Sequence, residues 1–170
     1  MKKLANFIPA YNDFPKKGIA FKDLLGIIQD PEIFGELIHR MSLNHVIQNS
    51  EAIISIEARG FIFGSAISLQ ASKPMIVARK PGKLPGEIFQ EDYSLEYGNN
   101  SLSVGKEALE KFSSYAIVDD ILATGGTVDC VTRLINKGGK KVSGLLTVVE
   151  LIELNGRLRF DFPVETILSI

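Results

Sequence analysis

The feature of this sequence that most constrains its fold is the alternation of short, continuous apolar runs with amphipathic segments. The apolar runs have the length and composition of buried β-strands and lie at residues 52–56, 75–78, 115–118, 142–149 and 164–168. Apolar side chains recur at helical spacing in segments 30–41, 61–71 and 128–135. Because strands of this kind are covered on both faces, the pattern predicts an α/β fold with a mostly parallel central sheet flanked by helices.

Two stretches interrupt this alternation. Residues 9–30 are rich in proline and glycine and are predicted to be irregular. Residues 80–104 begin with a similar composition and continue into two strand-like runs, so we expect a long loop that leads into a hairpin. Long loops inside a compact domain often serve as lids or binding elements. With 170 residues, the chain is expected to form a single domain over 1–170.

The charge balance and the cysteine content exclude several classes of protein. The chain has 19 basic and 20 acidic side chains, which argues against a broad face for nucleic acid. It has no apolar run long enough to span a membrane. Cys130 is the only cysteine, so no disulfide forms within the chain, and with no signal-peptide pattern we expect a cytoplasmic protein. We interpret Cys130 as a packing residue and expect no zinc site at His39 or His45.

Residues 116–127 join an apolar strand to a helix through two acids, hydroxyl residues and two glycines. Gly125 and Gly126 allow backbone N–H groups to approach an anion closely, and the start of the helix adds free N–H groups and a positive dipole end. Thr124 and Thr127 can add hydroxyl donors. The segment therefore predicts a binding loop for a phosphate monoester.

The adjacent acids Asp119 and Asp120 would repel a phosphate at close range. They are better suited to neutral hydroxyl groups or to a metal, and a ribose 5-phosphate offers hydroxyls beside its phosphate. The P-loop pattern for nucleotides does not occur in the sequence. A plain glycine–threonine turn with a helix cap remains the alternative interpretation.

The segment AIVDDILATGGT (116–127) resembles the ribose-phosphate signature of the type I phosphoribosyltransferase family. Other segments resemble the adenine-using members of that family, in the same order along the chain: FPKKGIAFKD (14–23), EARGFIFG (57–64), ARKPGKLPG (78–86) and YSLEYG (93–98). The resemblance extends from residue 14 to about residue 160, and YSLEYG discriminates best among family members. It implies the type I phosphoribosyltransferase fold, with a small N-terminal hood at about 1–30, a core at about 31–170 and a flexible lid hairpin at about 80–104.

The resemblance also implies a reaction of purine salvage. In that reaction the 5-phosphoribosyl group of phosphoribosyl pyrophosphate (PRPP) is transferred to adenine, which gives AMP and pyrophosphate. Mg²⁺ is expected as cofactor, bound mainly through the substrate. The similar enzymes are homodimers in which basic residues reach the neighbouring site. One rival is a relative that acts on hypoxanthine or xanthine, which the hood and YSLEYG disfavour. Another is a PRPP-sensing regulator of DNA, which would need an added DNA-binding domain or a basic face.

Individual residues receive roles from the resemblance. Glu96 is the expected acid or base near the purine, Arg59 is expected to act in catalysis, and Tyr97 belongs to the lid. The ribose phosphate is expected at Asp119, Asp120, Ala123, Thr124, Gly125, Gly126 and Thr127. Pyrophosphate is expected at Arg59, Arg79, Lys80 and Lys83. Adenine is expected at Ala20, Phe21 and Lys22.

Purely structural roles stay open for several of these residues. Arg59 could cap carbonyl groups, the basic loop could be solvated, Glu96 could lie on the surface, and Phe21 could pack in the core. In the family the peptide bond before the arginine, here Ala58–Arg59, is often cis. The hood departs from the family pattern at Ala20, where a larger aliphatic residue is usual, and at Lys22, where arginine is usual.

Overall fold

The computed structural model describes residues 2–13, 16–18, 20–95 and 98–170, and the chain forms two compact units, Met1–Arg40 and Met41–Ile170. Among the described helices, none is both long enough and apolar enough to cross a bilayer.

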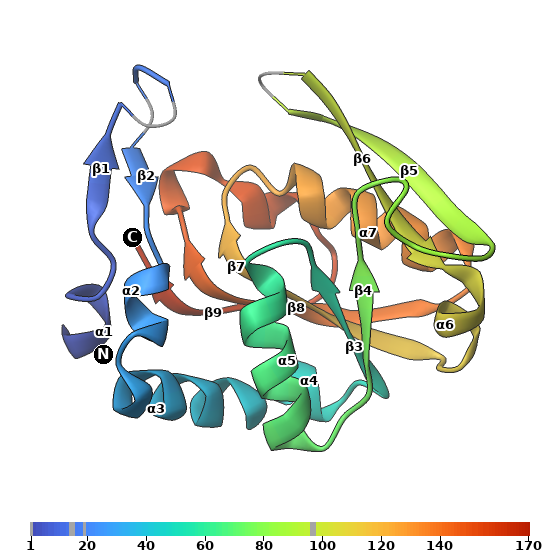
Figure 1. The fold of residues 1–170 in the computed structure, drawn as a ribbon, viewed down its shortest axis with the longest axis horizontal. Coiled ribbons are helices and arrows are strands. Elements are labelled where there is room, and N and C mark those ends of the chain that lie inside the picture. Colours follow the sequence, from blue (N-terminus) through green and yellow to red (C-terminus); the bar gives the residue numbers. More distant parts are fainter. Residues whose placement is uncertain (1, 14–15, 19, 96–97) are drawn as a thin grey trace. The chain divides into compact units, whose positions relative to one another are not determined.

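The N-terminal unit contains more regular structure than the sequence predicts. It holds α1 (Lys2–Ala5), β1 (Ala10–Asn12), β2 (Ala20–Lys22), α2 (Leu25–Ile28) and most of α3 (Pro31–Ser42) (Figure 1). The prediction of irregular chain over 9–30 was wrong, because β1 and β2 pair as an antiparallel ribbon. Each strand has only three residues, too few to show an alternating pattern.

Helix α3 begins where the sequence predicts. The carboxylate Oδ1 of Asp30 accepts hydrogen bonds from the backbone N–H groups of Glu32, at 3.0 Å, and Ile33, at 3.1 Å. These two bonds satisfy donors that the first turn of a helix otherwise leaves unpaired.

The C-terminal unit carries the central sheet. Its elements in chain order are α4 (His45–Gln48), β3 (Ala52–Ile56), α5 (Gly60–Ala71), β4 (Met75–Ala78), β5 (Ile88–Leu95), β6 (Gly98–Gly105), α6 (Lys106–Glu110), β7 (Ser114–Leu122), α7 (Gly126–Lys137), β8 (Lys141–Glu150), the 3₁₀ turns η1 (Ile152–Leu154) and η2 (Gly156–Arg159), and β9 (Val164–Ser169). The sheet order is β4-β3-β7-β8-β9, and all four pairings are parallel. The predicted α/β fold with a parallel central sheet is confirmed.

The core explains why the strands appear as continuous apolar runs. All five residues of β3 are buried, and α5 packs on β3 and β7 while α7 packs on β7 and β8. Cys130 of α7 is also buried, in agreement with its predicted packing role. A strand covered on both faces has no solvent side, so polar residues do not alternate along it.

Strand β7 is longer than the predicted run of 115–118. The sequence places Asp119 and Asp120 in the following loop, but the parallel ladder with β8 continues through Asp119, paired with Thr147, to Leu122, paired with Glu150. The prediction failed because the two acids end the apolar run, whereas the backbone hydrogen bonds of the strand continue past them. The binding loop is therefore shorter than predicted, and both acids belong to strand β7.

The predicted hairpin is present and is also longer than expected. Strands β5 and β6 pair antiparallel from Ile88 and Gly105 to Leu95 and Gly98, and Figure 1 shows them as a projecting ribbon. The base of the ribbon is joined to the end of β4 by two backbone hydrogen bonds between Arg79 and Ser103, of 2.9 and 2.7 Å. This attachment places β6 beside the carboxyl end of β4.

Candidate active site

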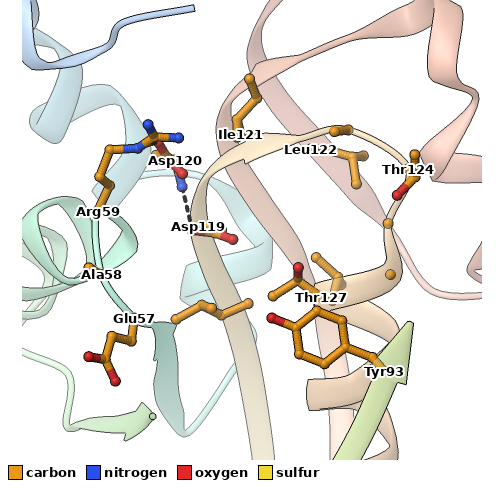
Figure 2. Close-up of a pocket in the computed structure, with 15 residues that line it drawn as sticks. Glu57, Ala58, Arg59, Tyr93, Asp119, Asp120, Ile121, Leu122, Thr124 and Thr127 are labelled. Atoms are coloured by element: carbon orange, nitrogen blue, oxygen red, sulfur yellow. Dashed lines mark hydrogen bonds and ion pairs between the residues drawn. The ribbon is translucent and has the colours of Figure 1, made fainter. Parts of the chain in front are cut away.

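A pocket of about 380 Å³ lies at the carboxyl ends of β3 and β7 (Figure 2). It is lined by Ile56, Glu57, Ala58, Arg59, Tyr93, Asp119, Asp120, Ile121, Leu122, Ala123, Thr124, Gly125, Gly126, Thr127 and Val128. Parallel α/β sheets bind their ligands at this edge. The two loops that the sequence singles out therefore meet at one cavity, together with one residue of the hairpin.

All seven residues predicted for the ribose phosphate line this pocket: Asp119, Asp120, Ala123, Thr124, Gly125, Gly126 and Thr127. The phosphate loop, defined here as residues 123–127, turns sharply at Gly125, whose φ is +81°. Helix α7 begins at the next residue, so backbone N–H groups of its first turn lie at the loop. The arrangement provides hydrogen-bond donors and a positive helix end for an anion.

The two acids of β7 have different environments. Asp120 is 4% exposed, and its carboxylate forms an ion pair with Nε of Arg59. The backbone N–H of Asp120 donates a 2.9 Å hydrogen bond to Oδ1 of Asp119. Burial and the nearby charge of Asp120 raise the pKa of Asp119 well above its ordinary value. The site therefore joins one carboxylate compensated by a guanidinium to a second carboxyl that loses its proton less readily than an ordinary aspartic acid.

The loop between β3 and α5 contains a cis peptide bond, one residue earlier than the family resemblance indicates. The bond joins Glu57 to Ala58 instead of Ala58 to Arg59. The expectation for Ala58–Arg59 is corrected accordingly. The sequence identifies this loop but does not show which of its peptide bonds is cis, because neither bond precedes a proline.

Three residues predicted to bind pyrophosphate, Arg79, Lys80 and Lys83, gather around Glu57. Oε2 of Glu57 lies 3.3 Å from Nε of Arg79 and accepts a 2.9 Å hydrogen bond from the backbone N–H of Lys80. Oε1 accepts a 3.0 Å bond from Nζ of Lys83. Glu57 itself lines the pocket, whereas the three basic residues are not among its lining residues and are linked to it through Glu57. Sequence reasoning assigned no role to Glu57, although it begins the quoted segment EARGFIFG.

These contacts change the pKa of the Glu57 carboxyl group. Burial raises its pKa, but the hydrogen bonds from Lys80, Lys83 and Arg79 outweigh burial and lower the pKa from 4.5 to about 2. A lowered pKa in the folded state means that the ionised group stabilises the fold above pH 4.5. This contribution decreases as the pH falls from 4.5 towards 2.

We predict that Glu57→Gln lowers the free energy of unfolding by about 1–2 kcal/mol at pH 7, because three donors lose a charged acceptor. Urea unfolding at pH 7 and at pH 3 measures the effect. The difference in the free energy of unfolding between the wild type and Glu57→Gln should be smaller at pH 3. Glu107→Gln is the matched control, since the Glu107 side chain is 91% exposed and should contribute almost nothing. An equal loss in both variants would contradict a specific role for Glu57.

Tyr93 is a second pocket residue to which sequence reasoning gave no role. It lies on β5, within the quoted segment YSLEYG, and lines the pocket together with Thr127. Figure 2 shows its ring beside Thr127. Burial raises the pKa of the Tyr93 phenol, so it stays neutral at physiological pH. The hairpin thus contacts the phosphate loop directly.

The remaining predicted site residues lie elsewhere. Ala20, Phe21 and Lys22 form β2 of the N-terminal unit, where Phe21 pairs with Tyr11. Glu96 and Tyr97 lie outside the described residues. The roles assigned to these five residues stay predictions.

Comparison with known proteins identifies the family. A model of the phosphoribosyl transferase domain matches residues 27–162. The adenine phosphoribosyltransferase of Prochlorococcus marinus (strain MIT 9515) is 68% identical over 164 residues, which cover 96% of both chains. The solved adenine phosphoribosyltransferase of Thermoanaerobacter pseudethanolicus superposes with a TM-score of 0.92 at 35% identity, covering 99% of both chains. That of Saccharomyces cerevisiae, complexed with adenine and D-2,5-dideoxy-2,5-imino-altritol 1,6-bisphosphate, gives 0.91 at 34% identity and covers 98% of this chain and 97% of its own. The chain described here belongs to the adenine phosphoribosyltransferase family.

Proposed function

We propose that this chain is an enzyme of purine salvage that transfers the 5-phosphoribosyl group of PRPP to adenine, forming AMP and releasing pyrophosphate. The observation that carries the proposal is the pocket in which a glycine-rich phosphate loop meets two carboxyl groups and an arginine. The yeast relative supports the pairing of substrates, since its structure holds adenine together with a phosphorylated sugar-like compound.

The sugar half of the reaction fits the pocket. The N–H groups and hydroxyls of residues 123–127 bind the 5-phosphate, and Asp119 and Asp120 accept or share hydrogen bonds with the ribose hydroxyls. The bond between ribose C1 and pyrophosphate breaks, and its electron pair leaves with the pyrophosphate oxygen. Arg59 stabilises that negative charge, together with Arg79, Lys80 and Lys83, which gather around Glu57.

The purine half rests on the family resemblance. Adenine N9 forms the new bond to ribose C1 and loses a proton, which Glu96 accepts. Backbone groups of Ala20, Phe21 and Lys22 form hydrogen bonds with the edge of the purine, and the Phe21 ring stacks on the purine ring. Tyr97 stabilises the closed lid, and lid closure excludes water that would otherwise hydrolyse the activated sugar.

Mg²⁺ is the proposed cofactor, held through oxygens of PRPP. Among the described residues, no group of three or more histidine, cysteine or acidic side chains is placed to bind a metal ion. Asp120 is already paired with Arg59, so the donors present fit a cation bound by substrate oxygens beside Asp119 and Asp120. When bound, Mg²⁺ would neutralise part of the pyrophosphate charge.

We also propose that the enzyme is a cytoplasmic homodimer. The family resemblance supports the dimer, because basic residues of the lid loop in similar enzymes reach the neighbouring site. The single cysteine is typical of proteins from a reducing compartment.

The decisive test is a comparison of bases. With PRPP and Mg²⁺, the purified protein should convert adenine to AMP roughly 100-fold faster than it converts hypoxanthine or xanthine. A site that forms hydrogen bonds with the amino group of adenine leaves its own polar groups without partners when hypoxanthine or xanthine presents a keto group instead. Separation of the nucleotide products by chromatography measures each rate. Faster use of hypoxanthine would refute the specificity for adenine. Binding of PRPP with no AMP formed would favour a regulator instead of an enzyme.

A further inference from the structure

The segment 155–160, which includes η2, packs directly against the phosphate loop. A Cβ atom on Gly156 would lie 2.1 Å from the carbonyl oxygen of Ala123, and a Cβ on Gly125 would lie 3.0 Å from Cδ of Arg159. In Figure 1 this segment follows β8 and lies beside the connection from β7 to α7. The aliphatic part of the Arg159 side chain therefore contacts the phosphate loop at its sharpest turn.

This support segment, residues 155–160, is fixed at its base by an ion pair between Arg157 and the buried carboxylate of Glu150. Arg157 donates to Glu150 through two bonds, from Nε to Oε1 at 2.7 Å and from a terminal nitrogen to Oε2 at 2.6 Å. The Glu150 side chain is 3% exposed. The backbone N–H of Leu151 also donates to the carbonyl of Leu122 at 2.9 Å. These bonds hold the support segment in a defined position relative to β7 and β8.

A second pocket, of about 430 Å³, adjoins the first and shares Tyr93, Thr124 and Gly126 with it. Its other lining residues are Asp92, Asp129, Arg133 and Arg159. Arg133 forms ion pairs with Asp129 and, at 3.6 Å, with Glu91. Arg159 is exposed and has no acidic partner among the described residues. It is the one basic side chain lining either described pocket whose charge is not paired with an acid.

We infer that Arg159 binds the 5-phosphate of AMP and PRPP, an inference that rests on the proposed function. A phosphate monoester carries close to two negative charges at neutral pH. The backbone N–H groups and hydroxyls of the phosphate loop carry no formal charge, so they leave the negative charge of the phosphate without a counter-charge. A guanidinium contributes both a compensating charge and paired N–H donors suited to phosphate oxygens. Arg159 supplies this group from outside the sequence motif of the loop.

The test compares the binding of a ligand that has the 5-phosphate with the binding of one that lacks it. Calorimetric titration of the wild type and of Arg159→Gln with AMP and with adenosine should show AMP binding weakened about tenfold and adenosine binding unchanged. Arg159→Lys should restore part of the affinity for AMP. In steady-state assays Arg159→Gln should raise KM for PRPP while KM for adenine stays the same. Leu158→Gln is the matched control, because its exposed side chain lies on the same segment and AMP binding should not change.

Three results would overturn the inference. An unchanged preference for AMP over adenosine in Arg159→Gln would show that Arg159 does not contact the phosphate. Equal weakening of both ligands would show that the residue acts on the fold of the site instead. A wild-type protein with no preference for AMP over adenosine would overturn the proposed function, and this inference with it.

Discussion

Asp120→Asn should lower kcat/KM for PRPP by about 100- to 1000-fold, the range found when a preorganised polar group is removed from an active site. The carboxylate is buried and paired with Arg59. An amide of the same shape loses the charge that holds Arg59 and the strong acceptor that the ribose hydroxyls require. Steady-state kinetics with PRPP as the varied substrate measures the loss, and circular dichroism checks that the variant is folded.

The partner residue makes this experiment more specific. Because Arg59 and Asp120 act as a pair, Arg59→Gln combined with Asp120→Asn should cost much less than the product of the two single losses. Asp161→Asn, at an exposed acid of the same unit, is the control and should leave the rate unchanged. A less than threefold loss in Asp120→Asn would remove the acid from the ribose site.

The second large effect is expected for Gly156→Ala, which should lower the free energy of unfolding by about 3 kcal/mol, the upper end for overpacked positions. The new methyl group would lie 2.1 Å from the carbonyl oxygen of Ala123, so the backbone of one segment must move. Since that carbonyl belongs to the phosphate loop, KM for PRPP should rise together with the loss of stability. Urea unfolding and initial-rate kinetics measure the two effects.

A second glycine of the chain provides the control. Gly35 lies inside helix α3, and a Cβ there would have no heavy atom within 4 Å apart from its own helix and neighbours. Gly35→Ala should therefore raise the free energy of unfolding by about 0.5–1 kcal/mol through helix propensity alone. If Gly156→Ala behaved like Gly35→Ala, the packing between the support segment and the phosphate loop would be refuted.

The sequence predicts the fold well where burial determines residue type. The five strands of the sheet appear as apolar runs because both faces of a parallel sheet are covered. The prediction fails where backbone hydrogen bonds alone determine the structure. Asp119 and Asp120 continue β7 although they interrupt its apolar run, and β1 and β2 are too short to leave a pattern.

In the site, the sequence predicts the members of each loop but not the contacts between loops. The motif places Asp120 in the ribose site and Arg59 in the pyrophosphate site, yet the two are bound to each other across 61 residues of chain. Likewise, Glu57 organises a basic cluster that no local pattern connects to it. Arg159 lies outside every motif and is placed at the phosphate loop only by the packing of Gly156 and Gly125.

The ion pair between Arg157 and Glu150 also limits how related sequences can diverge. A lysine offers a single ammonium group and cannot reproduce two parallel bonds to a carboxylate, so a change at position 157 alone leaves a buried charge with an incomplete partner. A substitution at position 150 or 157 is then tolerated only when the other position also changes. Among homologues, the residues at these two positions should therefore covary.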